Sequence, residues 1–305
     1  MRVLVIANPK AGQGLRIPAF LRRLLRVPVR EEFSLKDARV RIENFFHSVS
    51  MPMEWAETQY AGHGRELAKD AVSRGVNVVI AVGGDGTVNE IINGLAGSQT
   101  ALGIIPAGTA NVLSGELGLP GDIGRACKII AEGNTRTIDL PYVNERYFSM
   151  MAGIGFDAHV VRLVDRRLKG RWGVFSYLIV TLCELPFYKF ESIEVITDAG
   201  ERLRGCYMFV QNAQSYGSGF SASPGSKFDD GLMELIVFPG RSLITVIQYL
   251  LSASKDRFNV EKRGVRSLQI STSHDIQIDG DFFGKGPANF GIKPAALNVL
   301  VPRKR

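Results

Sequence analysis

The sequence lacks the features that mark a disulfide-rich, zinc-binding, secreted or membrane-spanning protein. Its three cysteines, Cys127, Cys183 and Cys206, are scattered, odd in number and without a C-x-x-C pair, so neither a disulfide framework nor a zinc site is indicated. The first residues lack the long apolar core of a signal peptide. The longest nearly uncharged stretch, residues 172–183, is shorter than the roughly 18 residues that suggest a spanning helix. We therefore expect a cytoplasmic protein without a transmembrane segment.

The composition is that of an ordinary globular protein. With 305 residues, 45% hydrophobic and 22% charged, the chain is long enough for two domains with separate cores. A net charge of +7 favours anionic partners. Nucleic acid is not expected, because the positive charge is spread widely and no helix-turn-helix, zinc-finger or ribonucleoprotein motif is present.

The most informative stretch is GGDGT at residues 83–87. It follows an apolar run, residues 77–82, that is typical of a buried parallel strand, and precedes an apolar helical pattern. Thr87 and Glu90 form a T-x-x-E pattern, which predicts that a capping box starts the helix at the motif. Backbone amides at such a junction attract phosphate. Asp85 would repel that phosphate unless a divalent cation lay between them, so the local chemistry favours a Mg-nucleotide site.

Two more small-residue loops follow predicted strands. NPKAG, residues 8–12, comes after the strand at residues 2–7, and PAGTAN, residues 106–111, after the strand at residues 101–105. A glycine turn alone can be a plain connection, but three such loops at strand carboxyl ends predict one shared crevice. None of them matches the Walker or Rossmann pattern, so these two nucleotide-binding architectures are not expected.

The pattern of predicted secondary structure changes near residue 134. Before it, strands at 2–7, 53–57, 77–82 and 101–105 alternate with helices near 17–27, 63–73, 87–96, 110–117 and 122–132, with a further helix between 31 and 51. After it come short alternating runs at 136–140, 146–150, 192–196, 206–211, 233–238, 267–270, 276–279 and 297–301, and helices near 158–168, 172–184 and 242–255. We predict an α/β domain with a parallel sheet at 1–133 and a β-rich antiparallel domain at 134–295.

The ordered set of motifs resembles the diacylglycerol kinase catalytic domain family, specifically its soluble bacterial lipid kinases. NPKAG, GGDGTVNEIINGL and LGIIPAGTAN carry the resemblance, which continues through AGIGFD at 152–157, KFDDG at 227–231 and IDGD at 278–281 and covers essentially the whole chain. It implies a two-domain fold related to NAD kinase, with residues 296–305 returning to the first domain and the active site in the interdomain cleft. It also implies ATP and Mg²⁺, and phosphorylation of a lipid hydroxyl at a membrane surface.

The resemblance carries site residues over position by position. The implied nucleotide-binding residues are Asn8, Pro9, Lys10, Ala11, Gly12, Thr58, Gly84, Asp85, Gly86, Thr87, Val88, Asn89, Glu90 and Thr109. Val112 stands where the family often has Asp, so one polar contact is expected to be missing. A structural Mg²⁺ is implied at Asp230 and the carbonyls of Lys227 and Leu232, although an Asp-Gly turn is an equally simple interpretation of this loop.

Asp281 matches the glutamate that the family is taken to use as general base, and is one methylene shorter. A general base must lie within hydrogen-bonding range of the attacking hydroxyl. The Asp279-Gly280 pair is also a common hairpin turn, and both roles can coexist. Together with Asp85, Asp281 is our candidate catalytic residue.

Some questions stay open at this point. The basic residues of segment 162–171, followed by Trp172, suit either an anionic membrane surface or a solvated helix face. A NAD kinase-like small-molecule kinase and a non-catalytic nucleotide- or lipid-binding regulator are the alternatives to an ATP-dependent lipid kinase. The sequence identifies neither the lipid nor the oligomeric state, and a homodimer remains open.

Overall fold

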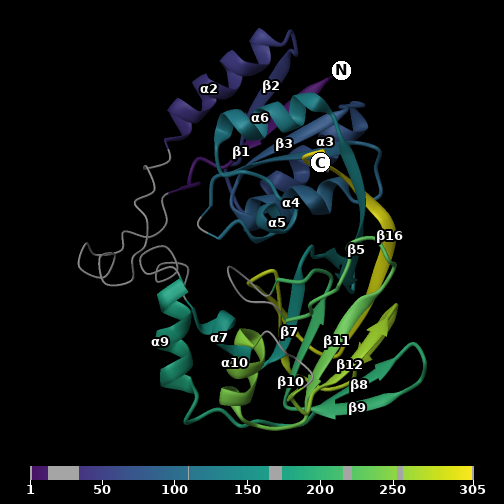
Figure 1. The fold of residues 1–305 in the computed structure, drawn as a ribbon. Coiled ribbons are helices and arrows are strands. Elements are labelled where there is room, and N and C mark those ends of the chain that lie inside the picture. Colours follow the sequence, from purple (N-terminus) through teal and green to yellow (C-terminus); the bar gives the residue numbers. More distant parts are fainter. Residues whose placement is uncertain are drawn as a thin grey trace.

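The computed structural model describes residues 2–12, 34–108, 110–164, 174–215, 222–252 and 257–303, and consists of an α/β domain followed by an antiparallel β-sandwich (Figure 1). The helix expected near residues 17–27 lies outside the described residues. Among the described helices, none is both long and apolar enough to cross a membrane.

The first domain is built on four parallel strands in the order β2-β1-β3-β4. The strands are β1 (Val3–Ala7), β2 (Met53–Glu57), β3 (Val78–Gly83) and β4 (Ala101–Pro106). The helices are α2 (Leu35–Ser48), α3 (His63–Ser73), α4 (Asp85–Leu95), α5 (Val112–Glu116) and α6 (Ile123–Glu132). Because β1, β3 and β4 are buried on both faces, their sequences are continuous apolar runs rather than alternating ones.

Helices cover both faces of this sheet. On one face, α2 and α6 bury Ile42, Phe46 and Ile130 against β1 and β3. On the other face, α3 and α4 bury Ala68 and Ile91 against the opposite side chains of the same strands. This three-layer arrangement is the α/β architecture that the alternating pattern predicts.

The second domain is a sandwich of two largely antiparallel sheets. One sheet has the order β12-β11-β10-β7-β14-β15, and the other continues the first domain's sheet through β16-β13-β8-β9, with β5 and β6 beside β16. Its strands are β5 (Thr135–Val143), β6 (Arg146–Tyr147), β7 (Met151–Gly155), β8 (Ile193–Thr197), β9 (Arg202–Gly205), β10 (Tyr207–Gln211), β11 (Met233–Phe238), β12 (Glu261–Val265), β13 (Ser267–Ile270), β14 (Asp275–Ile278), β15 (Asp281–Lys285) and β16 (Ala288–Leu300). Side chains such as Ile154, Val210 and Phe290 fill the space between the sheets.

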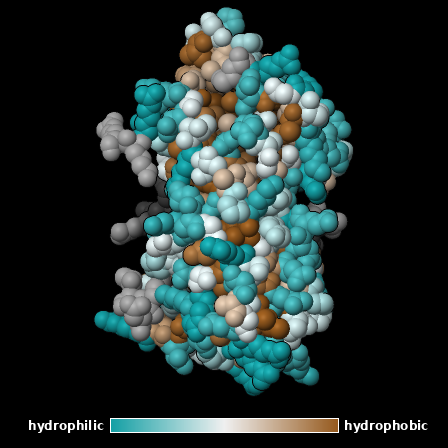
Figure 2. Space-filling model, turned by 90° about the vertical axis from the view of Figure 1, so that its right-hand side faces the viewer, coloured by the Kyte–Doolittle hydropathy of each residue, from teal (hydrophilic) through white to brown (hydrophobic). Residues whose placement is uncertain are grey.

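Three helices lie on the outer side of the six-stranded sheet: α7 (Phe156–Leu163), α9 (Val174–Glu184) and α10 (Leu243–Leu251). Aromatic rings pack beneath them, with Phe156 4.9 Å from Tyr188 and Phe238 5.1 Å from Tyr249 between ring centroids. The opposite side of the molecule is mostly hydrophilic, with apolar side chains in small separate areas (Figure 2).

Strand β16 joins the two domains. The sequence pattern predicts only residues 297–301 as a strand, whereas β16 runs from Ala288 to Leu300. Its last residues pair with β4 in the first domain, with Val299 opposite Leu102, and its first residues pair with β13 in the second. The register of its pairing with β5 shifts between Lys293 and Leu297. Pro294 and three neighbouring exposed or half-buried residues hide the strand pattern there.

The remaining differences concern short strands. The expected strand at 146–150 ends at Tyr147, and β7 begins at Met151 instead. Strands β9, β12 and β15 were not predicted, because polar residues and glycines outnumber apolar ones in each of them. Their backbones are held by ladder partners that are distant in sequence or by a hairpin, which local alternation does not reveal.

Candidate active site

The three glycine-containing loops leave the same edge of the parallel sheet. Strands β1, β3 and β4 are parallel neighbours, with Ala7 opposite Val82 and Gly83 opposite Pro106 at their carboxyl ends. The Asn8 N–H donates to the Val82 carbonyl at 3.0 Å as the first loop begins. The NPKAG, GGDGT and PAGTAN loops therefore share one edge.

Two of these loops touch through their glycines. A Cβ atom added at Gly84 would lie 3.1 Å from the Gly108 Cα, and one added at Gly108 would lie 2.5 Å from the Gly84 Cα. The Asn111 side chain closes the third loop on itself, accepting from the Gly108 N–H at 2.9 Å and donating to the Gly108 carbonyl at 2.8 Å. Any side chain at position 108 would therefore push the loops apart, and one at position 84 would press against the Gly108 backbone.

The first loop is tied to GGDGT by side chains. The Asn8 Nδ2 donates to the Thr87 Oγ1 at 2.9 Å, and the Asn8 Oδ1 accepts from the Lys10 N–H at 2.9 Å. Thr87 is buried. Asn8 and Thr87, two of the residues assigned to nucleotide binding, therefore also shape the loops through hydrogen bonds to protein atoms.

The predicted capping box is wrong. Helix α4 begins at Asp85, with Gly84 as its N-cap and without a side-chain cap. Glu90 instead accepts from Gly62 N–H at 2.8 Å and Gly64 N–H at 3.0 Å, at the start of α3. Because Gly62 has no side chain to cap α3, the neighbouring helix supplies the carboxylate. The N-cap residue of α4 consequently provides no side-chain hydrogen bond to the first turn of this helix.

Asp85 connects the second loop with helix α5. Its Oδ1 accepts from the Val112 N–H at 2.8 Å. The residue at position 112 contributes here through its backbone amide, so an apolar side chain is no obstacle. Burial raises the pKa of the Asp85 carboxyl, the Val112 amide opposes this shift, and the Asp279 carboxylate raises the pKa further. Among the described residues, no lysine or arginine forms an ion pair with Asp85 or Asp279.

Asp279 is the residue that the sequence interpretation underrated. Asp279 and Gly280 form the tip of the β14–β15 hairpin with φ values of 47° and 81°, as in a type I′ turn. The Asp279 carboxylate accepts five hydrogen bonds, from Ser149 N–H (2.7 Å), Ser149 Oγ (3.0 Å), Met150 N–H (2.9 Å), Met151 N–H (3.1 Å) and Asn89 Nδ2 (2.9 Å). It therefore fastens the hairpin to α4 of the first domain.

Asp281 is carried to the GGDGT loop by this hairpin. It is the first residue of β15 and pairs with Ile278 across the turn. A Cβ atom added at Gly86 would lie 3.8 Å from the Asp281 Oδ2. The two candidate catalytic carboxylates, Asp85 and Asp281, thus belong to segments that meet between the domains.

The expected structural metal loop is held by a residue outside the motif. Lys227, Asp230 and Leu232 are exposed, and the Asp230 Oδ1 accepts from the Leu232 N–H at 3.1 Å, which makes an Asx turn. The buried Asp139 accepts from the Gly231 N–H at 2.7 Å and from the Ala295 N–H at 2.7 Å. Across the described ranges, no group of three His, Cys, Asp or Glu residues could hold a metal ion.

The remaining expected positions are Thr58, Thr109 and the basic segment 162–171. Thr58 follows β2, where its N–H donates to the Ala7 carbonyl at 2.9 Å and its side chain is largely buried. Thr109 lies outside the described residues, as does most of the basic segment 162–171. Nothing in the sequence signals Asp139, since a single acidic residue inside a predicted strand has no motif around it.

Comparisons with known proteins agree with this arrangement. The diacylglycerol kinase catalytic domain family matches residues 2–143, and the YegS C-terminal NAD kinase beta sandwich-like domain matches residues 150–301. A protein named "Probable lipid kinase YegS-like" from Cronobacter sakazakii is 30% identical over 262 residues, which are 82% of this chain and 87% of that protein. A diacylglycerol kinase from Staphylococcus aureus is 29% identical over 310 residues, with 99% and 92% covered.

A solved structure extends the likeness to the fold. The crystal structure of a diacylglycerol kinase from Bacillus anthracis str. Sterne has a TM-score of 0.73 at 21% identity, covering 99% of this chain and 97% of that one. At this identity the likeness concerns the fold alone. Taken with the two domain matches and the relative that is 30% identical, it leads to one conclusion: the chain belongs to the diacylglycerol kinase catalytic-domain family and carries the C-terminal domain of its YegS-like members.

Proposed function

We propose that this protein is an ATP-dependent lipid kinase that transfers the γ-phosphate to a hydroxyl group of a diacylglycerol-like lipid. The observation that carries the proposal is the position of Asp281, whose carboxylate lies beside Gly86 of the GGDGT loop although it comes from the second domain. A carboxylate facing a glycine loop at a helix N-terminus combines a proton acceptor with a phosphate-binding edge.

The residues present fit a Mg-nucleotide. The close approach of Gly84 and Gly108 leaves backbone rather than side chains at the rim of the loops, and α4 begins there without a side-chain cap. Asp85 is buried near Asp279, and neither has an ion-pair partner among the described residues. The Asp85 carboxylate suits a hard divalent cation, and Asp279, whose carboxylate accepts five hydrogen bonds, adds negative charge nearby. When bound, Mg²⁺ would neutralise phosphate charge next to Asp85.

In this proposal, groups of the protein position the phosphates and activate the lipid hydroxyl. Backbone amides of the NPKAG, GGDGT and PAGTAN loops hold the phosphates, and the Asn8–Thr87 hydrogen bond keeps two of the loops in register. The Asp281 carboxylate accepts the proton of the lipid hydroxyl as that oxygen attacks the γ-phosphorus, and ADP leaves. The fixed hairpin tip limits the movement of Asp281, because Asp279 is bonded on several sides.

One assay separates this function from its alternatives. Labelled phosphate transfer from Mg-ATP is measured to extracted lipids and, separately, to NAD, with the lipid product identified by mass spectrometry. Phosphorylated lipid without phosphorylated NAD supports the proposal. A phosphorylated dinucleotide would favour the NAD kinase-like alternative, since the C-terminal domain family is described as NAD kinase beta sandwich-like. No transfer to either acceptor, despite measurable nucleotide or lipid binding, would favour a regulator.

The KFDDGL loop gives a prediction about a second, structural Mg²⁺. A cation bound by Asp230 and the carbonyls of Lys227 and Leu232 would stabilise the native state in proportion to the logarithm of occupancy. We expect added Mg²⁺, without nucleotide, to raise the Tm of the wild type more than that of Asp230→Ala. Thermal unfolding followed by circular dichroism measures both shifts.

Asp229→Ala is the matched control for that measurement. Asp229 pairs with Arg136 at 3.0 Å instead of turning into the loop, so its removal should preserve the Mg²⁺-dependent shift. If Asp230→Ala shifts as much as the wild type, Asp230 serves only the Asx turn that it forms with the Leu232 N–H.

A further inference from the structure

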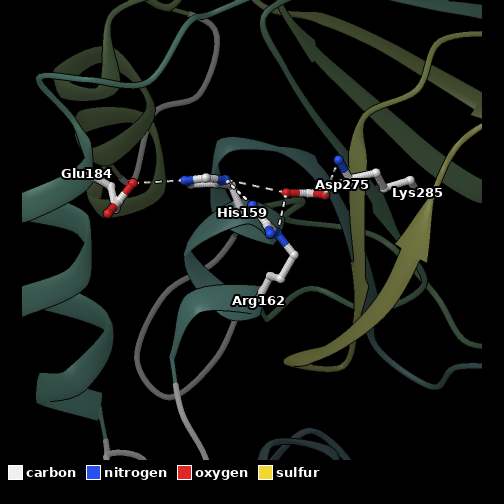
Figure 3. Close-up of polar contacts among 5 residues, drawn as sticks. All are labelled: His159, Arg162, Glu184, Asp275 and Lys285. Carbon is white, nitrogen blue, oxygen red and sulfur yellow. Dashed lines mark hydrogen bonds and ion pairs between the residues drawn. The ribbon is translucent and has the colours of Figure 1, made fainter.

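Helix α9 is bound to the catalytic hairpin through polar contacts on its inner face. The Tyr177 hydroxyl donates to the Gly280 carbonyl at the hairpin tip, at 3.4 Å. At the other end of α9, its last residue Glu184 lies 3.1 Å from the His159 Nε2, and the His159 Nδ1 lies 3.4 Å from Asp275 at the base of the hairpin (Figure 3). The inner face of α9 therefore contacts the hairpin near its tip and, through His159, near its base.

The Asp275 carboxylate is the centre of this second contact. It is only 6% exposed, and it lies 2.9 Å from the Arg162 Nε and 3.9 Å from the Lys285 Nζ (Figure 3). Lys285 stands opposite Asp275 in the β14–β15 ladder, so the cluster joins both strands of the hairpin to helix α7 and, through His159, to α9. The position of α9 is thus fixed relative to Asp281.

The outer face of α9 is apolar and exposed. Ile179 is 51% exposed and Leu182 63%, one helical turn apart, and Phe187 just after the helix is 82% exposed. A surface helix normally buries its apolar stripe and exposes its polar one. In α9, Tyr177 and Val180 pack on the core, whereas Ile179 and Leu182 face outward, so the exposed face of this helix also carries large apolar side chains.

Helix α10 repeats this arrangement on the same side of the six-stranded sheet (Figure 1). Val246 and Tyr249 are buried, whereas Ile244 is 68% exposed, Ile247 45% and Leu251 64%, at a spacing of three and four residues. We call the exposed apolar side chains of the α9 and α10 segments the docking surface. It consists of Ile179, Leu182, Phe187, Ile244, Ile247 and Leu251.

Among the described residues at the ends of the α9 and α10 segments, exposed cations outnumber the exposed anion Glu191. Lys189, Arg241 and Arg257 are exposed at the ends of these segments. The acidic Glu184 faces His159. Exposed apolar side chains with cations at their margin match the interface of an anionic bilayer, where each basic residue adds attraction and the apolar groups enter the acyl region.

We infer that the docking surface binds a lipid bilayer that contains anionic lipids. This inference rests on the proposed function for its purpose, because Tyr177 places the inner face of α9 against the hairpin tip next to Asp281. A bilayer on the outer face would then be about one helix diameter, about 10 Å, from the hairpin that carries the proton acceptor. Bilayer contact would deliver the hydroxyl of a membrane lipid to the interdomain cleft.

Flotation with vesicles tests the surface directly, without ATP and without turnover. Vesicles of phosphatidylcholine with phosphatidylglycerol should bind the wild type, and vesicles of phosphatidylcholine alone should bind it less. The double variant Leu182→Ser/Ile247→Ser removes one large apolar group from each helix. We expect it to weaken vesicle binding by at least about tenfold, since burying one such side chain is worth about that factor or more.

The matched control places the same change elsewhere. Val40 and Val49 of the α2 region are 50% and 43% exposed but lie in the first domain. The double variant Val40→Ser/Val49→Ser should bind vesicles like the wild type. Equal vesicle binding by the α9/α10 variant and the control would overturn the location, and a wild type that ignores anionic vesicles would overturn the inference itself.

Cys183 supplies an independent readout on α9. It is exposed, whereas Cys127 and Cys206 are buried, so a polarity-sensitive fluorophore can be attached selectively next to Leu182. The emission should shift to the blue on anionic vesicles and stay unchanged when Lys189→Gln/Arg241→Gln/Arg257→Gln abolishes the charge attraction at moderate salt. A blue shift that appears with protein concentration in the absence of vesicles, together with a dimer by sedimentation, would instead assign this face to a second copy of the chain.

Activity separates this inference from the proposed function. The Leu182→Ser/Ile247→Ser variant should phosphorylate a short-chain, monomeric diacylglycerol as the wild type does, and lose activity only on lipid presented in vesicles. Vesicle binding without any lipid phosphorylation would leave the docking surface supported and the proposed reaction refuted. Equal loss on both substrates would show that the substitutions damage the active site and would contradict a docking role.

Discussion

The Asp281→Asn variant should retain its fold and lose about 10²–10⁴-fold in kcat, the usual cost of removing a general base. Asparagine keeps the size of the side chain at the start of β15 but does not accept the proton. ATP binding should change little, because the nucleotide is assigned to loops of the first domain. Steady-state kinetics with lipid and ATP varied separately measures both quantities.

Two further variants sharpen this result. Asp281→Glu restores the residue that the family resemblance leads us to expect and should keep substantial activity if the hydroxyl can adjust. In Asp279→Asn, an amide replaces a carboxylate that accepts five hydrogen bonds. Because some of these bonds are lost, the free energy of unfolding should fall by about 1–3 kcal/mol. If Asp281→Asn keeps most of the wild-type kcat, the base must be sought elsewhere.

The Asp85→Asn variant should be almost inactive at saturating Mg-ATP, with a loss of at least about 10²-fold in kcat. Its asparagine Oδ1 can still accept from the Val112 N–H, so the junction between the second loop and α5 is preserved. The loss would therefore report the missing negative charge beside the phosphates. Near wild-type turnover in the folded variant would refute the assignment of Asp85 as the partner of the metal ion beside the phosphates.

The same variant should be more stable than the wild type in the absence of ligands. Burial and the Asp279 carboxylate raise the pKa of Asp85 above its ordinary 3.8. A group with a raised native pKa adds stability at low pH and loses that contribution as pH rises through its native pKa. The Tm advantage of Asp85→Asn should thus be small near pH 4, at about the ordinary pKa of Asp, and larger at neutral pH. An advantage independent of pH would contradict this explanation.

Local patterns predicted the first domain well. Strand β2 and helix α3 have the expected bounds, and the continuous apolar runs before each glycine loop are buried parallel strands. Such runs are informative because helices cover both faces of a parallel sheet. The three loops come together for the same reason, since parallel neighbours end at a common edge.

The interactions that complete the site could not be predicted in this way. Glu90 caps a different helix, Asp279 bonds to α4 and to the segment before β7, and Asp139 holds a loop and a strand far away in sequence. Each is a single acidic residue that accepts from at least two backbone amides, and a backbone amide leaves no mark in the sequence. Motifs reveal the loops of this site, whereas the fastening between them depends on the tertiary fold.

Strand β16 has a consequence for the order in which the protein can fold during synthesis. The edge of the first domain at β4 receives its last strand from residues near Val299, which leave the ribosome after all the other described strands of the two sheets. Until then, the nascent domain presents an unpaired strand edge beside apolar side chains, a common starting point for aggregation. Truncation of the chain before β16 would therefore leave both domains incomplete. Chaperones that cover β4 during translation would reduce aggregation at this stage.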